Sequence, residues 1–406
     1  MQTWLSEALG QPSALAALAL LAAGVLVSFI AGSALVFIWL ERKIAGRIQD
    51  RLGPTRVGGR FGWLQTVADG IKLLTKEDTM PARADPFLFR IAPYIAFCGS
   101  FVAFLALPFG NQLVARELDT AIFFMLAVLS SEVFGVILAG WGSGSKWSLF
   151  GGIREAAQVV SYEVPRALTV LLPVMLVGSL SLTDIAAAQQ GWFWSWHVFH
   201  DPFCFVGFFT FFICATASCK RAPFDLAEAE SELVAGFHTE YSGLRWSFFF
   251  MAEYGSMFAV SGLATLLYLG GWHTGLLPFE PSERFGFVLG NLLNLAVFIA
   301  KSYLLVMVMM WARWSLPRLR IDQVMTTCLK YLLPISCVLL VGLALWQLAV
   351  PVQVRTTTPL VLAIGSLLGM LGVLLAALTV PVSAPRDGLP GVWANLPTPL
   401  LRTRQR

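Results

Sequence analysis

Two polar runs carry most of the reactive side chains of this 406-residue chain. The first extends from Glu41 to Gly58 and alternates arginines with glycines. Arginines supply fixed positive charge and glycines let the backbone approach a ligand closely, so this run predicts a shaped binding site. The second, from Arg221 to Glu240, contains five carboxylates. Carboxylates crowded near an apolar medium raise one another's pKa, which suits them to holding and passing protons near neutral pH.

Each run also has a simpler interpretation. The arginines could be a topology signal that contacts anionic lipid headgroups. The spacing of Asp225 and Glu228 is typical of a helix start, with Asp225 as N-cap and Glu228 at the third helical position. That interpretation does not explain Glu230 and Glu232, which would face different directions on a helix. We therefore keep all four acids as candidates for proton handling.

Three further acids lie inside apolar stretches, at Glu132, Glu163 and Glu253. Ionisable groups within a bilayer are costly and usually mark an ion or proton path. Glu163 has an alternative, because Arg166 follows it at helical spacing and could neutralise it. The helices that carry the other two offer no nearby base. Lys301 is a further candidate, or its side chain could extend to the membrane surface.

Other reactive residues give weak signals. His197 and His200 lack a third metal ligand, so we predict no metal site, and His238 could transfer protons or be structural. No phosphate loop, dinucleotide fingerprint or nucleophile elbow is present, which argues against a nicotinamide, a flavin or any other redox centre bound by this chain alone. The six cysteines are scattered and contain no CxxC pair, so they are expected to be small core residues: positions 98, 204, 214, 219, 328 and 337.

The elements that position these residues are membrane spans. The chain is 57% hydrophobic and 13% charged, whereas soluble domains carry about 25% charged residues. Apolar stretches near the necessary length of about 20 residues predict an all-α polytopic integral membrane protein. The nine expected spans are 14–40, 90–109, 120–140, 156–179, 202–219, 246–269, 287–312, 331–350 and 359–380. The net charge of +4 gives no reason to expect nucleic-acid binding.

The distribution of basic residues predicts the orientation of these spans. If the loop at 41–89 is cytoplasmic, that side holds 23 of the 28 lysines and arginines. The N-terminus is then outside and the basic loops are inside. The first apolar stretch is too long for a signal peptide and should remain as a span. Within the first inner loop, apolar residues at helical spacing in 63–78 predict an amphipathic helix on the membrane surface.

The motifs occur in an order that resembles a known family. The segments Glu41–Gly58 and Leu64–Glu77 are followed by a motif from Ala139 to Glu163, by Arg221–Glu232 and by Leu316–Gln323. In these segments the chain resembles the H-type heel subunits of the membrane arm of proton-pumping NADH:quinone oxidoreductases, respiratory complex I. The resemblance covers residues 39–334. It implies that residues 1–350 form the eight-span domain of the family and that 351–406 form an extension with an extra span and a basic tail.

The resemblance also implies roles for individual residues. The chain would form the membrane side of a quinone chamber, lined by Glu41, Arg42, Arg51, Phe224 and Asp225. An acidic path would link quinone reduction to proton translocation. Its members would be Glu132, Glu163, Glu228, Glu230, Glu232 and Glu253.

The same resemblance implies partners and location. FMN and iron–sulfur clusters would reside in soluble-arm subunits, with small and antiporter-like subunits beside the chain in a bacterial inner membrane. Quinone would be the substrate, and lipid would surround the spans.

Two features depart from the family and three alternatives remain. The run Ser218-Cys219-Lys220 stands where many members have an acidic residue and an asparagine, and Gly144-Ser145 stand where many have asparagines. The chain could instead be the membrane anchor of a related energy-converting hydrogenase, although its intact glycine–proline and acidic runs argue against this. A channel or transporter acting alone would not explain the long patterned inner loops. A purely structural scaffold would leave the chamber residues without a task.

Overall fold

The computed structural model describes residues 11–111, 113–276, 281, 284 and 286–379, and all regular structure in these ranges is helical. Eight of the helices are long and apolar enough to cross a membrane. The prediction of an all-α polytopic membrane protein is therefore confirmed. The chain divides into two compact units, Met1–Leu362 and Ala363–Arg406, and both polar runs lie in the first. The predicted basic tail falls outside the described residues.

The predicted spans all correspond to helices. Seven are single elements: α2 (Gln11–Ile48), α4 (Pro86–Ala103), α5 (Ala121–Gly142), α6 (Lys146–Val177), α11 (Gly243–Tyr268), α13 (Phe287–Ser315) and α16 (Val352–Thr379). The eighth runs without a break through α14 (Ile321–Met325), a π-helical segment (Thr326–Leu332) and α15 (Leu333–Ala349). The remaining predicted span, 202–219, is α9 (Pro202–Ser218), which has 17 residues, just within the range of about 17–25 that can cross a bilayer.

Several helices extend beyond the predicted boundaries. α2 continues to Ile48 and so includes the start of the first polar run, and α6 begins at Lys146, ten residues before the expected start at 156. Hydropathy marks only the apolar part of a helix, whereas backbone hydrogen bonds continue through polar turns. As a result, Glu41 and Glu155 are helical residues rather than loop residues.

Aspartate–proline pairs start two of the spans. The carboxylate of Asp85 accepts hydrogen bonds from the backbone nitrogens of Phe87 (2.9 Å) and Leu88 (3.2 Å) at the start of α4. Asp201 does the same for Cys204 (2.7 Å) at the start of α9. In both helices proline takes the first helical position, where no backbone N–H is required. These caps fix where each helix begins.

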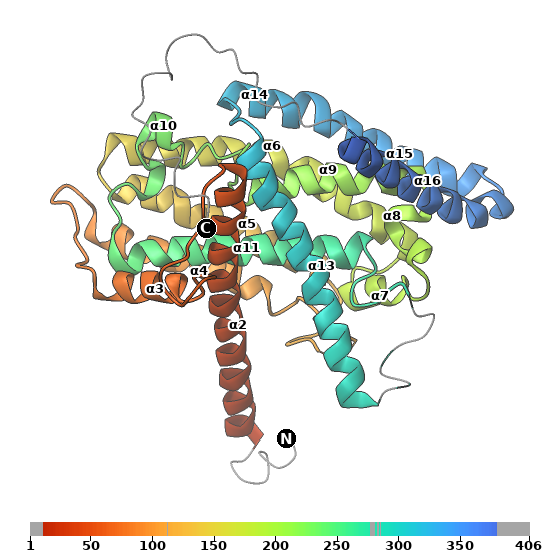
Figure 1. Cartoon of the computed structure of the whole chain (residues 1–406), viewed down its shortest axis with the longest axis horizontal. Helices are drawn as coiled ribbons and strands as arrows, with labels where there is room; N and C mark the ends of the chain where they lie inside the picture. Colours follow the sequence, from red (N-terminus) through yellow and green to blue (C-terminus); the bar gives the residue numbers. More distant parts are fainter. Residues whose placement is uncertain (1–10, 112, 277–280, 282–283, 285, 380–406) are drawn as a thin grey trace, which may run out of the picture. The chain divides into compact units, whose positions relative to one another are not determined.

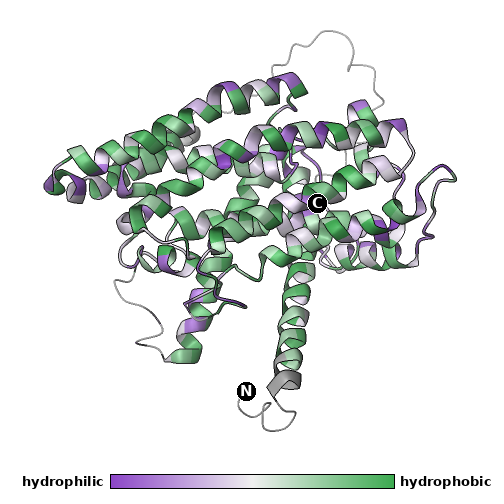
Figure 2. Cartoon of the chain, turned by 180° about the vertical axis from the view of Figure 1, so that it is seen from behind, coloured by the Kyte–Doolittle hydropathy of each residue, from purple (hydrophilic) through white to green (hydrophobic). Residues whose placement is uncertain are grey.

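Helix α11 is the centre of the first unit. Of its most apolar stretch, 89% is buried, and it packs against α2, α3 (Gln65–Thr75), α4, α9 and α13. In Figure 1, α4, α5, α6, α9 and α11 run side by side, and α2 and α13 cross them steeply. Figure 2 shows hydrophobic residues dominating the long helices and hydrophilic ones gathering on loops and short helices.

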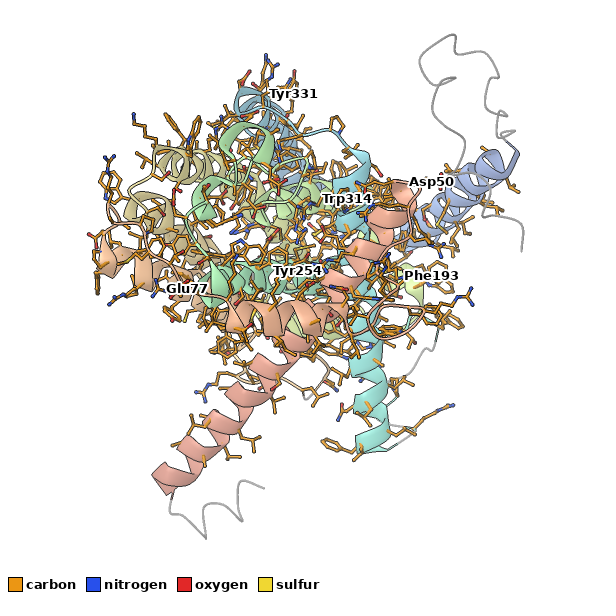
Figure 3. All side chains as sticks on the ribbon, turned by 60° about the vertical axis from the view of Figure 1, so that its left-hand side comes forward. Asp50, Glu77, Phe193, Tyr254, Trp314 and Tyr331 are labelled. Carbon is orange, nitrogen blue, oxygen red and sulfur yellow. The ribbon has the colours of Figure 1, made fainter. Side chains whose placement is uncertain are left out.

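The short helices lie at the two ends of this bundle. α3 and α10 (Glu230–Leu233) lie at the end where α4 and α6 begin, on the left of Figure 1, and α7 (Leu182–Ala187) and α8 (His197–His200) lie at the other. Figure 3 likewise places Glu77 and Phe193 on opposite sides of Tyr254. The two polar runs meet within the first unit, where Glu41 of the first pairs with Arg221 of the second.

The expected amphipathic helix is present as α3, which covers Gln65–Thr75 of the predicted 63–78. Val67, Ile71 and Leu74 are exposed on it, as the prediction of a membrane-surface helix requires. The loop before it is tied to α2, since the indole nitrogen of Trp39 donates to the carbonyl of Phe61 (2.9 Å). α3 is thereby held beside α2 and α11.

Candidate functional site

A cluster of buried charges lies where α2, α11 and α13 meet the loop after α9. Glu41 of α2 accepts two 2.9 Å contacts from Nη1 of Arg221 and one of 2.7 Å from Nη1 of Arg313. The hydroxyl of Tyr254 also donates to it. We call Glu41, Arg313 and Tyr254, together with Arg221 and Glu253, the buried ion cluster. Figure 3 shows Tyr254 on α11, surrounded by other side chains.

Arg221 holds the buried ion cluster together. Its Nε lies 2.5 Å from Oε1 of Glu253, and its guanidinium stacks on the ring of Tyr254 at 4.5 Å. The side chain is almost fully buried. Burial acts to lower the pKa of Arg221, but Glu253 and Glu41 outweigh burial and raise it well above its ordinary value. The cluster therefore contains two permanent cations, Arg221 and Arg313, facing two carboxylates.

A second buried pair joins Lys220 to Glu132 of α5. The backbone of α5 is held close to α4 at this level, because a Cβ at Gly99 would lie 2.8 Å from the nitrogen of Glu132 and one at Gly135 would lie 2.5 Å from the nitrogen of Ala96. Burial acts to lower the pKa of Lys220, yet Glu132 and Glu155 raise it above its ordinary value. Lys220 is therefore a charged lysine deep in the protein.

The acidic loop, residues 219–242, is folded tightly against α6. At Gly236, which has φ +58°, a Cβ would lie 1.8 Å from the carbonyl of Ala227, so only glycine fits. Within this loop, Asp225 is buried and pairs with Nη2 of Arg318 at 2.9 Å. Burial raises the pKa of Asp225 despite the opposing effect of Arg318. Desolvation thus outweighs the neighbouring arginine at this carboxyl group.

A small cavity of about 10 Å³ lies between the acidic loop, α5 and α11. This is room for about one water molecule. Its polar lining comes from three carboxylates, one lysine and one histidine: Glu132, Glu228, Glu253, Lys220 and His238. Burial, followed by the charges of Glu253 and Asp225, raises the pKa of Glu228 well above its ordinary value. We call this space the acid cavity.

His238 should behave as a neutral residue over the physiological pH range. Burial lowers its pKa from the ordinary 6.5 to about 4. Between these two pH values His238 is therefore protonated in the unfolded chain and neutral in the folded chain. His238 therefore destabilises the fold as pH falls from 6.5 to 4, by up to about 3 kcal/mol. We expect His238→Gln to lose less thermal stability than the parent over this interval, measured as unfolding temperature in detergent. An equal loss in both proteins would contradict this assignment.

A larger cavity of about 340 Å³ opens between α2, α3 and α11. Most of its lining is apolar, from residues such as Ala34, Ile38 and Leu73. Arg42 and Asp69, which form an ion pair, also line it. The volume lies within the range of about 300–1,000 Å³ of known small-molecule sites, which are typically apolar with a few polar groups. We call it the apolar cavity.

An aromatic wall separates the apolar cavity from the acid cavity. Trp246 and Phe250 line both cavities. Their rings stack at 4.7 Å, and Phe250 meets the ring of Tyr254 edge-on at 5.0 Å. Tyr254 in turn carries Arg221 on its face. A molecule in the apolar cavity would thus lie one layer of side chains from the buried carboxylates.

The chain matches the family model described as NADH dehydrogenase over residues 21–344. It belongs to this family. It is 44% identical over 359 residues to the NADH-quinone oxidoreductase H subunit of Anaeromyxobacter dehalogenans, covering 86% of each chain. It is also 44% identical to the H subunit of Chlorobium luteolum, over 82% of this chain and 90% of the relative, and 46% identical to that of Chlorobaculum tepidum, over 78% and 89%. The family resemblance inferred from the motifs is confirmed.

The NADH dehydrogenase fold brings most of the predicted acids together. Glu41, Glu132, Glu228, Glu253 and Asp225 come from four separated segments and meet around the buried ion cluster and the acid cavity. Their distances along the sequence give no sign of this meeting. Their basic partners were also not assigned from the sequence, because partners 32 to 272 residues away leave no local pattern.

Other predicted members lie apart from this group. Glu230 and Glu232 are exposed on α10, where Glu232 pairs with Arg154 at 2.5 Å. Arg51 is exposed in the loop after α2 and contacts Gln49 at 2.7 Å. Phe224 is buried in an apolar cluster with Tyr162 and Val324 rather than lining either cavity.

Glu163 has the neutralising partner that its spacing allows. Nη2 of Arg166 lies 2.7 Å from Glu163, and the hydroxyl of Ser130 donates to the same carboxylate at 2.9 Å. Lys301 does not reach a membrane surface; its ammonium donates to three backbone carbonyls, those of residues Leu269, Gly271 and His273. Hydrogen bonds to carbonyls account for the burial of this lysine.

One local prediction is wrong. Asp225 is not the N-cap of a helix that begins there, because residues 226–228 form turns and α10 begins only at Glu230, after Ala229. Asp225 pairs with Arg318 across 93 residues, and the backbone of Glu228 also hydrogen-bonds its carboxylate. The short-range contact therefore closes a turn instead of starting a helix.

Glu155 is a buried acid that sequence patterns missed. It is 0% exposed in α6, and neither carboxylate oxygen has a hydrogen-bond partner among the described residues. The late predicted start of this span left it in a loop, where a glutamate is unremarkable. Its position one residue after Arg154 gave no signal of burial.

Proposed function

We propose that this chain is the membrane subunit of an NADH:quinone oxidoreductase that binds the quinone and couples its reduction to proton translocation. The observation that carries the proposal is the apolar cavity lying across a shared aromatic wall from the acid cavity. A quinone is an apolar tail joined to a headgroup that takes up electrons and protons. The apolar cavity matches the tail, and the acid cavity supplies carboxylates near the headgroup.

The apolar cavity suits the tail of the quinone. Its walls come from one span, one amphipathic surface helix and the central helix α11, so a lipid-soluble molecule could enter from the membrane. Arg42 lies on this cavity and the adjacent Glu41 belongs to the buried ion cluster. Together with Asp225, Arg51 and Phe224, they are our proposed quinone-chamber residues; of the five, only Arg42 lines one of the two cavities.

The buried carboxylates suit the coupling of electron and proton transfer. A quinone that accepts electrons becomes anionic and attracts protons, which changes the occupancy of carboxylates nearby. Glu132, Glu228 and Glu253 share the acid cavity and should titrate as one unit. We propose that Glu163, Glu230 and Glu232 extend this path away from the acid cavity.

The electrons would come from partner subunits. FMN and iron–sulfur clusters belong to the soluble arm in this proposal, docked on the end of the bundle that carries α3 and the acidic loop. Small membrane subunits and antiporter-like subunits would receive the protonic signal within the membrane. In this proposal the end with the basic loops faces the cytoplasm of a bacterium, the N-terminus lies outside, and the distribution of lysines and arginines supports this orientation in the inner membrane.

Asp225→Asn should separate quinone reduction from electron input. The substitution removes the charge that faces Arg318 while keeping the shape of the side chain. We expect NADH:quinone reduction in membranes to fall by about a hundredfold, the effect of losing one proton-transferring group. NADH:ferricyanide activity and assembly should remain, because neither needs the quinone chamber.

Unchanged quinone reduction in Asp225→Asn would remove this residue from the mechanism. The subunits that co-migrate with the chain on a native gel give an independent check. NADH dehydrogenase partners support the proposal. Hydrogenase partners or no partners would favour the alternatives of a hydrogenase anchor or a channel.

A further inference from the structure

Glu155 is buried without any hydrogen-bonding partner for its carboxylate among the described residues. Burying a charge costs far more than burying a neutral polar group unless a counter-charge lies beside it. A carboxyl group buried in this way must either remain protonated and neutral or pair with a cation that moves towards it. The surrounding charges decide between these two states.

The charges around Glu155 do not balance. In the described part of the chain, four cations face six carboxylates in this region: Lys220, Arg221, Arg313 and Arg318 against Glu41, Glu132, Glu155, Asp225, Glu228 and Glu253. The four cations are in contact with Glu41, Glu132, Glu253 and Asp225. Glu228 borders the acid cavity, where a water molecule can solvate it, whereas Glu155 does not line that cavity. Among the acids of this region in the described part of the chain, Glu155 is thus the one that neither contacts a cation nor lines the acid cavity.

Lys220 is the one of these four cations whose charge acts on Glu155. It contacts Glu132 directly and interacts electrostatically with Glu155 as well. Its ammonium is a compact charge on a flexible four-carbon stem, whereas the arginines are fixed forks. Arg221, next to it, is already held by two carboxylates and a tyrosine ring.

We propose that Glu155 is a further proton-holding residue of this protein and that Lys220 is a positioning residue whose ammonium moves between Glu132 and Glu155. In one state Lys220 pairs with the Glu132 carboxylate and Glu155 is the neutral acid. In the other state Glu155 has given its proton to Glu132, and Lys220 pairs with the Glu155 carboxylate. One proton moves from Glu155 to Glu132 while the ammonium moves the opposite way, so no net charge is created. This inference rests on the proposed function, because it adds a station to the acidic path.

The groups that face Glu155 fit a two-state element. Asp225 of the acidic loop and Glu132 of α5 repel its negative form, and Lys220 stabilises it. On its own helix, Tyr162 is buried two turns further along and also interacts with it electrostatically. Gln158 of α6 is fixed elsewhere, since its amide donates to the carbonyl of Ala217 at 2.8 Å. Only Lys220 among these groups can stabilise the negative form of Glu155 by moving.

The test uses the whole complex that contains this chain and compares Glu155→Gln with the parent. We expect the infrared difference spectrum between oxidised and NADH-reduced complex to lose one band of a protonated carboxylic acid. We also expect proton translocation to fall on the order of a hundredfold while quinone reduction uncoupled from pumping continues. Glu117→Gln, which changes an exposed carboxylate at the opposite end of the bundle, should alter neither measurement.

Further variants keep the test decisive. If Glu155→Gln fails to assemble, Glu155→Asp keeps the carboxyl group and should shift the same band rather than abolish it. Lys220→Met should impair assembly, because it leaves the Glu132 carboxylate buried without its cation. The double variant Lys220→Met with Glu132→Gln should restore assembly but not proton translocation. An unchanged band together with unchanged translocation in the Glu155 variants would overturn the inference. Failure of the proposed function would look different, because the parent complex itself would then reduce no quinone with NADH.

Discussion

Arg221→Met is expected to prevent stable assembly of the complex and to abolish quinone reduction. The substitution leaves Glu253 buried without its cation and removes two of the contacts to Glu41. Breaking one side of a buried ion pair costs about 3–5 kcal/mol, because the remaining charge stays desolvated. Such a loss is a large part of the stability of any protein. A native gel of solubilised membranes and an NADH:quinone assay measure the two effects.

Two companion variants distinguish charge from packing. Arg221→Met combined with Glu253→Gln removes both partners, so assembly should return in part while quinone reduction stays low. Arg221→Lys keeps the charge but cannot hold two carboxylates in fixed geometry, so it should fall between the parent and Arg221→Met. Full assembly and activity in Arg221→Met would show that the buried ion cluster does not hold this end of the bundle together.

Gly70→Trp should block the apolar cavity and sharply reduce the use of long-tailed quinones. Gly70 of α3 lines this cavity, and a Cβ built on it meets no atom within 4 Å, so a large side chain would grow into the open space. We expect kcat/KM for a long-tailed quinone to fall roughly 10–200-fold, the range produced by a steric change within an apolar pocket. A short-tailed quinone should lose less, because less of it needs the cavity.

Gly70→Ala is the matched control for this prediction. Alanine fits the same open space and is a better helix former by about 1 kcal/mol, so α3 should be as stable or more stable. Quinone kinetics should stay close to those of the parent. Equal kinetics for long-tailed quinone in all three proteins would show that the tail does not occupy the apolar cavity.

The sequence predicts the membrane-spanning helices well and the ion-pair partners of the buried acids poorly. Hydropathy alone located all nine apolar helices, because a bilayer imposes both a length and a composition on each. It placed the start of α6 ten residues too late, since Lys146 and Arg154 are polar yet lie in continuous helix. That error is the reason why Glu155 was assigned to a loop.

The candidate site was predictable by residue type and not by geometry. Glu41, Asp225, Glu132 and Glu253 were identifiable as acids next to or within spans, where charge is costly. What neutralises them was not, because Arg221, Arg313, Arg318 and Lys220 approach from other segments. The expected helix start at Asp225 is wrong because the chain continues as turns through residues 226–228, although its carboxylate keeps the backbone contact with Glu228.

The most direct test of the quinone site is photolabelling. A photoreactive quinone with its reactive group on the tail would be irradiated in membranes that contain the complex, and the labelled peptides of this chain would be identified by mass spectrometry. The apolar cavity predicts labels in residues 31–42 of α2, 66–74 of α3 and 244–251 of α11, and their loss when unlabelled quinone is in excess. Labels confined to other helices, or labels that excess quinone does not displace, would contradict it.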